Sequence, residues 1–89
     1  MFPDVYRYPA IFSYEEDGVH IVFPDLPGCI TFGKDEGDAV RAAREALTLH
    51  LYGMEQDEEA IPPPSSMMTL AEQEALQKNE VFLLVEVFM

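Results

Sequence analysis

Two prolines and a glycine interrupt the apolar sequence of this chain in the stretch Phe23-Pro24-Asp25-Leu26-Pro27-Gly28-Cys29. Prolines cannot donate to a sheet, and together with the glycine they fix a bend. Alternating apolar residues before the bend predict a strand over 19–23, with Val19 and Ile21 facing the same way as Phe23. A short third strand, 29–32, resumes after the bend.

The spacing of apolar residues further upstream predicts a first strand over 5–14. Its apolar face carries Tyr6, Tyr8, Ala10, Phe12 and Tyr14. Pro9 has no amide hydrogen, so it should lie where no neighbouring strand needs its donor. A turn over 15–18 follows, in which Gly18 is free to adopt a positive φ. The three strands therefore form an antiparallel meander.

Apolar residues at helical spacing predict a long helix after the third strand. Asp35 or Asp38 can cap its start, and it runs to about Met54. The predicted buried stripe contains Val40, Ala43, Leu47, Leu51 and Met54, supported by Ala39 and Ala46. Gly53 lies near the end of the helix, where a left-handed cap favours glycine.

The rest of the chain predicts a connector, a second helix and a last strand. Three prolines at 62–64 favour an extended connector. Thr69 and Glu72 have capping-box spacing, so a short helix should open there and run through Leu76. Residues 81–88 close the chain as a fourth strand. We therefore expect a single α+β domain over residues 1–89: a three-stranded antiparallel meander, a long helix, a short helix and a fourth strand.

The last strand is apolar on both faces. Val81, Leu83, Val85 and Val87 alternate with Phe82, Leu84 and Phe88. One long helix covers only one face of a sheet, so the second face needs another cover. We expect Phe82, Leu84 and Phe88 to form an interface with a second copy of the chain. The short helix is the alternative cover.

The charge of the chain is strongly acidic. Seventeen Asp and Glu residues face five Lys and Arg residues, for a formal net charge of −12. Such a surface repels nucleic acid and anionic membranes and attracts a basic protein. We expect no direct nucleic-acid binding and no membrane contact. For such a partner, we expect the docking residues to be Glu55, Asp57, Glu58 and Glu59. A solvated loop is the alternative interpretation of this acidic run.

Nothing in the sequence favours a catalytic residue, a metal ligand or a cofactor. Asp4, Asp25, Asp35 and Asp38 suggest a metal-dependent nuclease, but turn and capping roles explain most of these carboxylates. His20 and His50 lack the spacing of metal ligands. Cys29 is better explained as a small buried thiol than as a nucleophile. A single cysteine, no leader-like segment and no long apolar stretch indicate the cytoplasm.

The order of elements and several motifs resemble the N-terminal domain of HicB antitoxins. These motifs are Tyr8-Pro9-Ala10, Asp17-Gly18, Val22 to Thr31 around the bend, Gly33, Asp38-Ala39, Ile61 to Ser65 and Val85-Glu86-Val87. The resemblance implies a partial ribonuclease-H-like fold, with the last strand parallel to the first. It also implies a partner, because HicB proteins mask the active surface of HicA toxins. Those toxins are small basic ribonucleases that cleave messenger RNA and use a histidine.

Many HicB proteins also carry a C-terminal DNA-binding domain. Here the sequence stops at Met89, directly after the last predicted strand. We therefore expect a short form, either natural or trimmed, that lacks this domain and binds duplex DNA weakly or not at all. Two alternatives to an antitoxin remain open: a standalone HicB-like homo-oligomer with a regulatory or scaffold role, and a metal-dependent nuclease.

Overall fold

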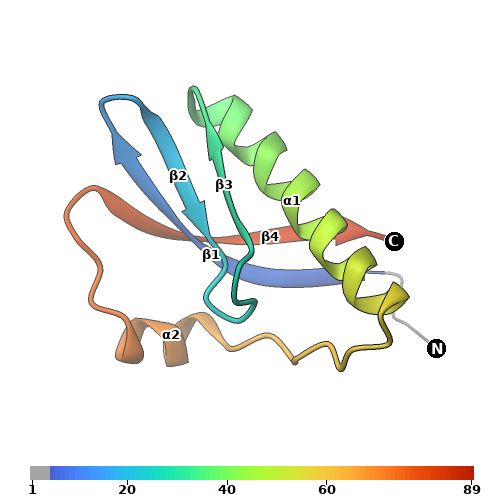
Figure 1. Cartoon of the computed structure of the whole chain (residues 1–89). Helices are drawn as coiled ribbons and strands as arrows, with labels where there is room; N and C mark the ends of the chain where they lie inside the picture. Colours follow the sequence, from blue (N-terminus) through green and yellow to red (C-terminus); the bar gives the residue numbers. More distant parts are fainter. Residues whose placement is uncertain (1–4) are drawn as a thin grey trace.

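The computed structural model describes residues 5–89 and contains one four-stranded sheet with a long helix across one of its faces (Figure 1). The elements in chain order are β1 (Val5–Glu15), β2 (Gly18–Val22), β3 (Ile30–Gly33), α1 (Glu36–Gln56), α2 (Met67–Gln73) and β4 (Glu80–Phe88). This order confirms the predicted α+β class and the meander of β1, β2 and β3.

The strand order is β3-β2-β1-β4, and every neighbouring pair is antiparallel. The expectation that the last strand lies parallel to the first is therefore wrong. After α1, the connector and α2 carry the chain back toward the start of β4, along the bottom of the view in Figure 1. It thus enters β4 beside the end of β1, where the Tyr14 amide donates to the Asn79 carbonyl at 2.8 Å.

The core lies between α1 and one face of the sheet. The β1 side chains on that face are the predicted ones, with Tyr8 and Phe12 almost fully buried. The buried residues of α1 are Ala39, Ala43, Leu47 and Leu51, one every fourth position. Val40 is exposed rather than part of the stripe, because the helix turns Ala39 toward the sheet.

The ends of the helices differ in part from the predictions. Asp35 caps α1 and accepts from the Asp38 amide at 2.9 Å, which decides between the two predicted caps. Gly53 remains inside α1, and the residue with a left-handed backbone is Glu58, at φ 56°. The cap of α2 is Ser66, whose hydroxyl accepts from the Thr69 amide at 3.0 Å. The predicted start at Thr69 is therefore wrong, because the hydroxyl three residues earlier takes the capping role, and α2 ends at Gln73.

The proline-rich bend is held by its own backbone and by buried side chains. Phe23 and Cys29 pair across its base at 3.1 Å, and the Leu26 amide donates to the Phe23 carbonyl at 3.0 Å. All three side chains are buried in the core. Gly28 has φ 87°, a backbone conformation that residues other than glycine rarely adopt. The bend is therefore a rigid part of the core.

The connector is tied to the bend and to β1. Asp25 accepts from both the amide and the hydroxyl of Ser65 at 2.7 Å. The Tyr8 hydroxyl donates to the Pro62 carbonyl. Tyr8 lies on the face covered by α1, so the connector runs along that same face. Burial raises the pKa of Tyr8, which keeps its hydroxyl a donor near neutral pH.

Gly33 permits close contact between β3 and α1. A Cβ atom at this position would lie 2.4 Å from the backbone nitrogen and Cα of Ala39. Gly33→Ala is therefore expected to lower the free energy of unfolding by about 1–3 kcal/mol, as overpacked cores do. Gly53→Ala is the control, because no atom lies within 4 Å of its added Cβ. It should stabilise the helix by about 1 kcal/mol. Urea unfolding followed by circular dichroism measures both, and a neutral Gly33→Ala would contradict the close contact.

The tie between Asp25 and Ser65 makes a second prediction. Asp25→Ala removes a charged acceptor of two hydrogen bonds and should destabilise the protein by about 1.5–3 kcal/mol. Ser65→Ala keeps the amide donor and should cost only about 1 kcal/mol. Urea unfolding gives the stabilities, and limited proteolysis reports release of the connector. Equal losses in the two variants would contradict the bidentate role of Asp25.

Candidate protein-binding surfaces

Five of the nine residues of the family-like motif are buried in the fold, whereas Pro27 and Gly28 at the tip of the bend are exposed. The motif consists of Tyr8, Pro9, Phe23, Pro24, Asp25, Leu26, Pro27, Gly28 and Cys29. Pro9 is fully buried and pairs with Leu84 of β4, beyond Ile11, where the pairing with β2 ends. Because β2 does not pair with β1 at this position, the missing amide hydrogen of Pro9 leaves no hydrogen bond to β2 unformed, as predicted. The bend is predictable from the sequence, whereas the contacts of Asp25 and Tyr8 with the connector are not.

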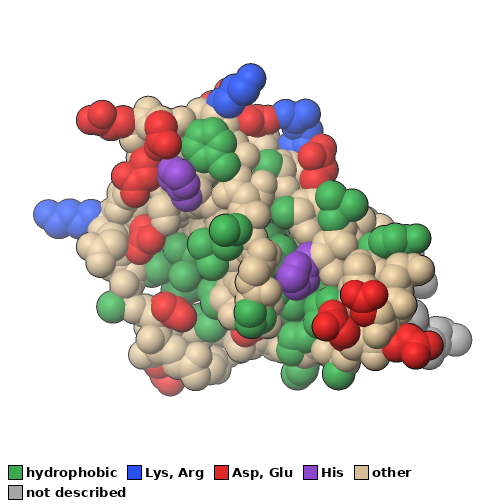
Figure 2. Space-filling model, in the orientation of Figure 1, with side chains coloured by type: hydrophobic (Ala, Val, Ile, Leu, Met, Phe, Trp, Pro, Cys, Tyr) green, Lys and Arg blue, Asp and Glu red, His purple; other side chains and the backbone are tan. Residues whose placement is uncertain are grey.

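The predicted docking residues Glu55, Asp57, Glu58 and Glu59 lie together at the C-terminal end of α1. Figure 2 shows acidic side chains gathered in the region where Figure 1 places this end. Within residues 5–89 none of the four forms an ion pair. Glu55 accepts from the Tyr6 hydroxyl at 3.3 Å. Burial, and then the Glu55 carboxylate, raise the pKa of Tyr6.

The helix itself adds to the negative potential at this end. The backbone dipoles of α1 place partial negative charge at its C-terminus, and its last turn contains no basic residue. Asp57, Glu58 and Glu59 are exposed to solvent. Their charges are therefore available to Lys and Arg side chains of a partner.

The second surface is the sheet face opposite α1. Leu84 and Phe88 are 54% and 73% exposed, and Phe82 is half-buried. The alternative in which the short helix covers them is wrong for Leu84 and Phe88, which remain exposed. The same face carries Val22, Ile30 and Phe32 of the other strands. An interface at Phe82, Leu84 and Phe88 remains a prediction.

The inner face of β4 is only half covered. Val85 and Val87 are buried under α1, but Val81 and Leu83 are 42% and 37% exposed. The expectation that all four residues pack beneath the helix is therefore only half right. α1 crosses the sheet obliquely and reaches only the C-terminal half of β4 (Figure 1).

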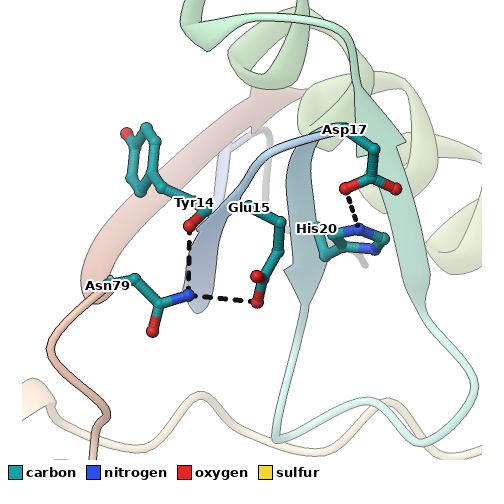
Figure 3. Close-up of polar contacts among 5 residues, drawn as sticks. All are labelled: Tyr14, Glu15, Asp17, His20 and Asn79. Carbon is teal, nitrogen blue, oxygen red and sulfur yellow. Dashed lines mark hydrogen bonds and ion pairs between the residues drawn. The ribbon is translucent and has the colours of Figure 1, made fainter.

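Polar contacts fix the far end of the sheet (Figure 3). The Asn79 side-chain amide donates to the Tyr14 carbonyl and to the Glu15 carboxylate, both at 3.0 Å. His20 lies on the face opposite α1, and its Nε2 atom is 3.2 Å from Oδ1 of Asp17. The Asn79 contacts hold the chain beside the end of β1 directly before β4 begins.

The described residues offer no metal centre and no activated nucleophile. Within residues 5–89, no group of three or more His, Cys, Asp or Glu side chains could hold a metal ion. Asp38 accepts from the Lys34 amide and from Arg41, which lower its pKa in that order. Burial raises the pKa of Cys29 to about 11, so this thiol is protonated near neutral pH. Asp4 lies outside the described residues. None of the described helices could cross a membrane.

Comparisons with known proteins agree with this arrangement. Residues 8–89 match a family described as the HicB_like antitoxin of bacterial toxin-antitoxin system. Antitoxin HicB 2 of Photorhabdus laumondii is 35% identical over 60 residues, which cover 67% of this chain and 43% of that protein. A Haemophilus phage HP1 protein of uncharacterised function is 36% identical over 55 residues, 62% of this chain and 41% of its own length. The chain thus spans less than half the length of these two relatives.

Solved structures share the fold. The N-terminal domain of Burkholderia pseudomallei antitoxin HicB aligns with a TM-score of 0.74 at 22% identity, covering 94% of this chain and 100% of that one. A chain of a HicA3 and HicB3 toxin-antitoxin complex aligns with a TM-score of 0.66 at 22% identity, covering 89% and 94%. Because the family match takes in the sheet, both helices and the bend, this chain belongs to the HicB-like antitoxin family of bacterial toxin-antitoxin systems.

Proposed function

We propose that this chain is a protein-binding module that neutralises a small basic HicA-type messenger-RNA ribonuclease by masking its active surface. Its membership of the HicB-like family supports this function, as does the complex of a similarly folded chain in the HicA3 and HicB3 assembly. The cytoplasm is the setting that we propose, since such a toxin acts on messenger RNA there.

The observation that carries the proposal is the unpaired acidic end of α1 in a chain of net charge −12. Toxin lysines and arginines would be drawn to this end and would lose their access to RNA once bound. Charge of this kind raises the association rate and selects basic partners. The negative potential of the acidic end would repel the phosphates of a nucleic acid.

Neutralising the acidic end tests the toxin contact. The triple variant Asp57→Asn, Glu58→Gln, Glu59→Gln should weaken binding to a HicA-type toxin at least about tenfold, or 1.4 kcal/mol. The toxin is a HicA-type protein inactivated at its histidine, and calorimetry at physiological salt gives Kd. The matched control is Glu16→Gln, Glu72→Gln, Glu74→Gln, which removes the same charge at exposed positions elsewhere.

The control should change Kd less than about twofold. At this salt concentration, electrostatic interactions between exposed charges are screened beyond roughly 8 Å, so charges far from the contact contribute little. Equal weakening by the two triple variants would mean that net charge alone matters and that the acidic end is not the docking site. A toxin that does not bind the unaltered chain at all would overturn the proposed function.

The chain should not be a nuclease, because the described carboxylates that suggested a metal site, Asp25, Asp35 and Asp38, have structural partners. Asp25 holds Ser65, and Asp35 and Asp38 organise the start of α1. RNA incubated with the purified chain and magnesium or manganese should remain intact. Metal-dependent cleavage that disappears in Asp25→Asn would establish the nuclease alternative instead. The homo-oligomeric alternative is favoured by a different observation, the exposed apolar residues of β4.

A further inference from the structure

The N-terminal half of β1 has one free side. β2 pairs with β1 only from Ile11 to Glu15. The Tyr14 amide donates toward β4, so the even-numbered residues of β1 direct their backbone groups to β4 and the odd-numbered residues direct theirs the other way. The amide and carbonyl of Arg7 therefore point to the side that β2 has left. Within residues 5–89, neither of these two groups forms a hydrogen bond.

A groove lies between this free side of β1 and the connector. Residues 5–8 of β1 line one wall, residues 59–64 line the other, and the groove has a volume of about 490 Å³. A volume of this size is typical of sites that bind a ligand. In Figure 1 the connector follows the half of β1 that β2 does not accompany. The fold thus keeps an open space beside unpaired backbone groups.

The connector cannot close this groove by pairing with β1 itself. Its three prolines at 62–64 have no amide hydrogen, so this run has no donor for the Arg7 carbonyl. The contacts of the connector with Tyr8 and Asp25 also hold it in place as a separate wall. An occupant of the groove must therefore bring its own backbone donors.

The free charge around the groove is negative. Glu59 lines the groove and belongs to the acidic end of α1, where no ion pair forms within residues 5–89. Among the described lining residues only Arg7 is basic, and its side chain is held by Glu86 at 2.6 Å on the face of the sheet opposite α1. Most of the remaining lining is apolar, with Ile61 and the prolines on the connector side. An apolar segment that carries a Lys or Arg residue fits this lining.

We propose that this groove binds an extended segment of the basic partner, which adds to β1 as an extra strand beside Arg7. The backbone of the segment exchanges two hydrogen bonds with the amide and carbonyl of Arg7, as a neighbouring antiparallel strand does. A Lys or Arg side chain of the segment contacts Glu59, and its apolar side chains pack on the prolines of the connector. The partner is the HicA-type toxin, so this inference rests on the proposed function and adds the way in which the toxin is held.

A proline at position 7 tests the backbone contact. Arg7→Pro removes the free amide hydrogen and leaves the pairing with β4 in place, because this amide points away from β4. Arg7→Ala is the matched control, since it also removes the ion pair with Glu86 but keeps the amide. In calorimetry with a HicA-type toxin inactivated at its histidine, Kd for Arg7→Pro should be at least about fivefold higher than Kd for Arg7→Ala. Circular dichroism confirms that both variants fold.

Hydrogen exchange followed by NMR tests the same contact in the unaltered chain. Without toxin, the Arg7 amide should exchange quickly, whereas the Tyr8 amide faces β4 and serves as the slow reference. Bound toxin should slow the exchange of the Arg7 amide at least about tenfold. Slow exchange in the free chain would mean that another part of the chain already occupies the groove, and it would overturn the proposal.

Two neighbouring glutamates test the place of the basic side chain. Glu59 lines the groove and Glu58 does not. Glu59→Gln should therefore raise Kd about threefold or more, and Glu58→Gln less than about twofold. Equal effects would overturn the contact with Glu59.

The outcomes separate this inference from the proposed function. If the toxin binds the unaltered chain, equal Kd values for the two Arg7 variants, or fast exchange of the Arg7 amide in the complex, would overturn the strand addition and leave the proposed function standing. A toxin that does not bind the unaltered chain would overturn both.

Discussion

The close packing of α1 on the sheet is the contact on which the rest of the structure depends. Gly33 has no side chain, and Ala39 and Ala43 have the smallest ones, so the first half of the helix approaches the strands closely. Leu47 and Leu51 then fill the wider space over the aromatic row of β1. A single helix cannot cover a whole twisted sheet. One face, half of β4 and the edge of β4 therefore remain open, and these are the surfaces left for partners.

The bend between β2 and β3 also holds the connector in place. It does so with a carboxylate, a group that serves catalysis in many enzymes. Asp25 is one of the carboxylates that suggested a metal-dependent nuclease in the sequence. Here both of its oxygens are occupied by Ser65, so the carboxylate holds the connector. The connector in turn returns the chain to the far end of β1. This carboxylate therefore has a structural role, because it fixes part of the path of the connector.

The sequence predicted those features that local patterns control. The alternation of Tyr8, Ala10 and Phe12 identified β1 and its buried face, and Asp35 was one of two capping residues expected. The direction of β4 was not predictable in this way, because it depends on the path of a proline-rich connector fixed by distant contacts. Tyr8 with Pro62, and Asp25 with Ser65, are 54 and 40 residues apart in the chain.

Smaller errors have the same origin. Thr69 has the spacing of a capping residue, but Ser66 has an equivalent hydroxyl one turn earlier, and only the geometry distinguishes them. The acidic run was recognisable in the sequence as a charged patch. Its position at the negative end of α1, and the absence of ion pairs at these residues within 5–89, required the structure. The half-covered state of β4 likewise follows from the angle of α1, which no periodicity encodes.

The two exposed surfaces differ in their physical character and occupy different parts of the molecule. The C-terminal end of α1 carries acidic side chains and the negative end of the helix dipole, whereas β4 exposes apolar side chains, and there Arg7 offsets Glu86. Added salt screens the electrostatic field of the acidic end and leaves the apolar surface of β4 unchanged. The strongest negative potential of the chain and its exposed apolar side chains therefore do not coincide.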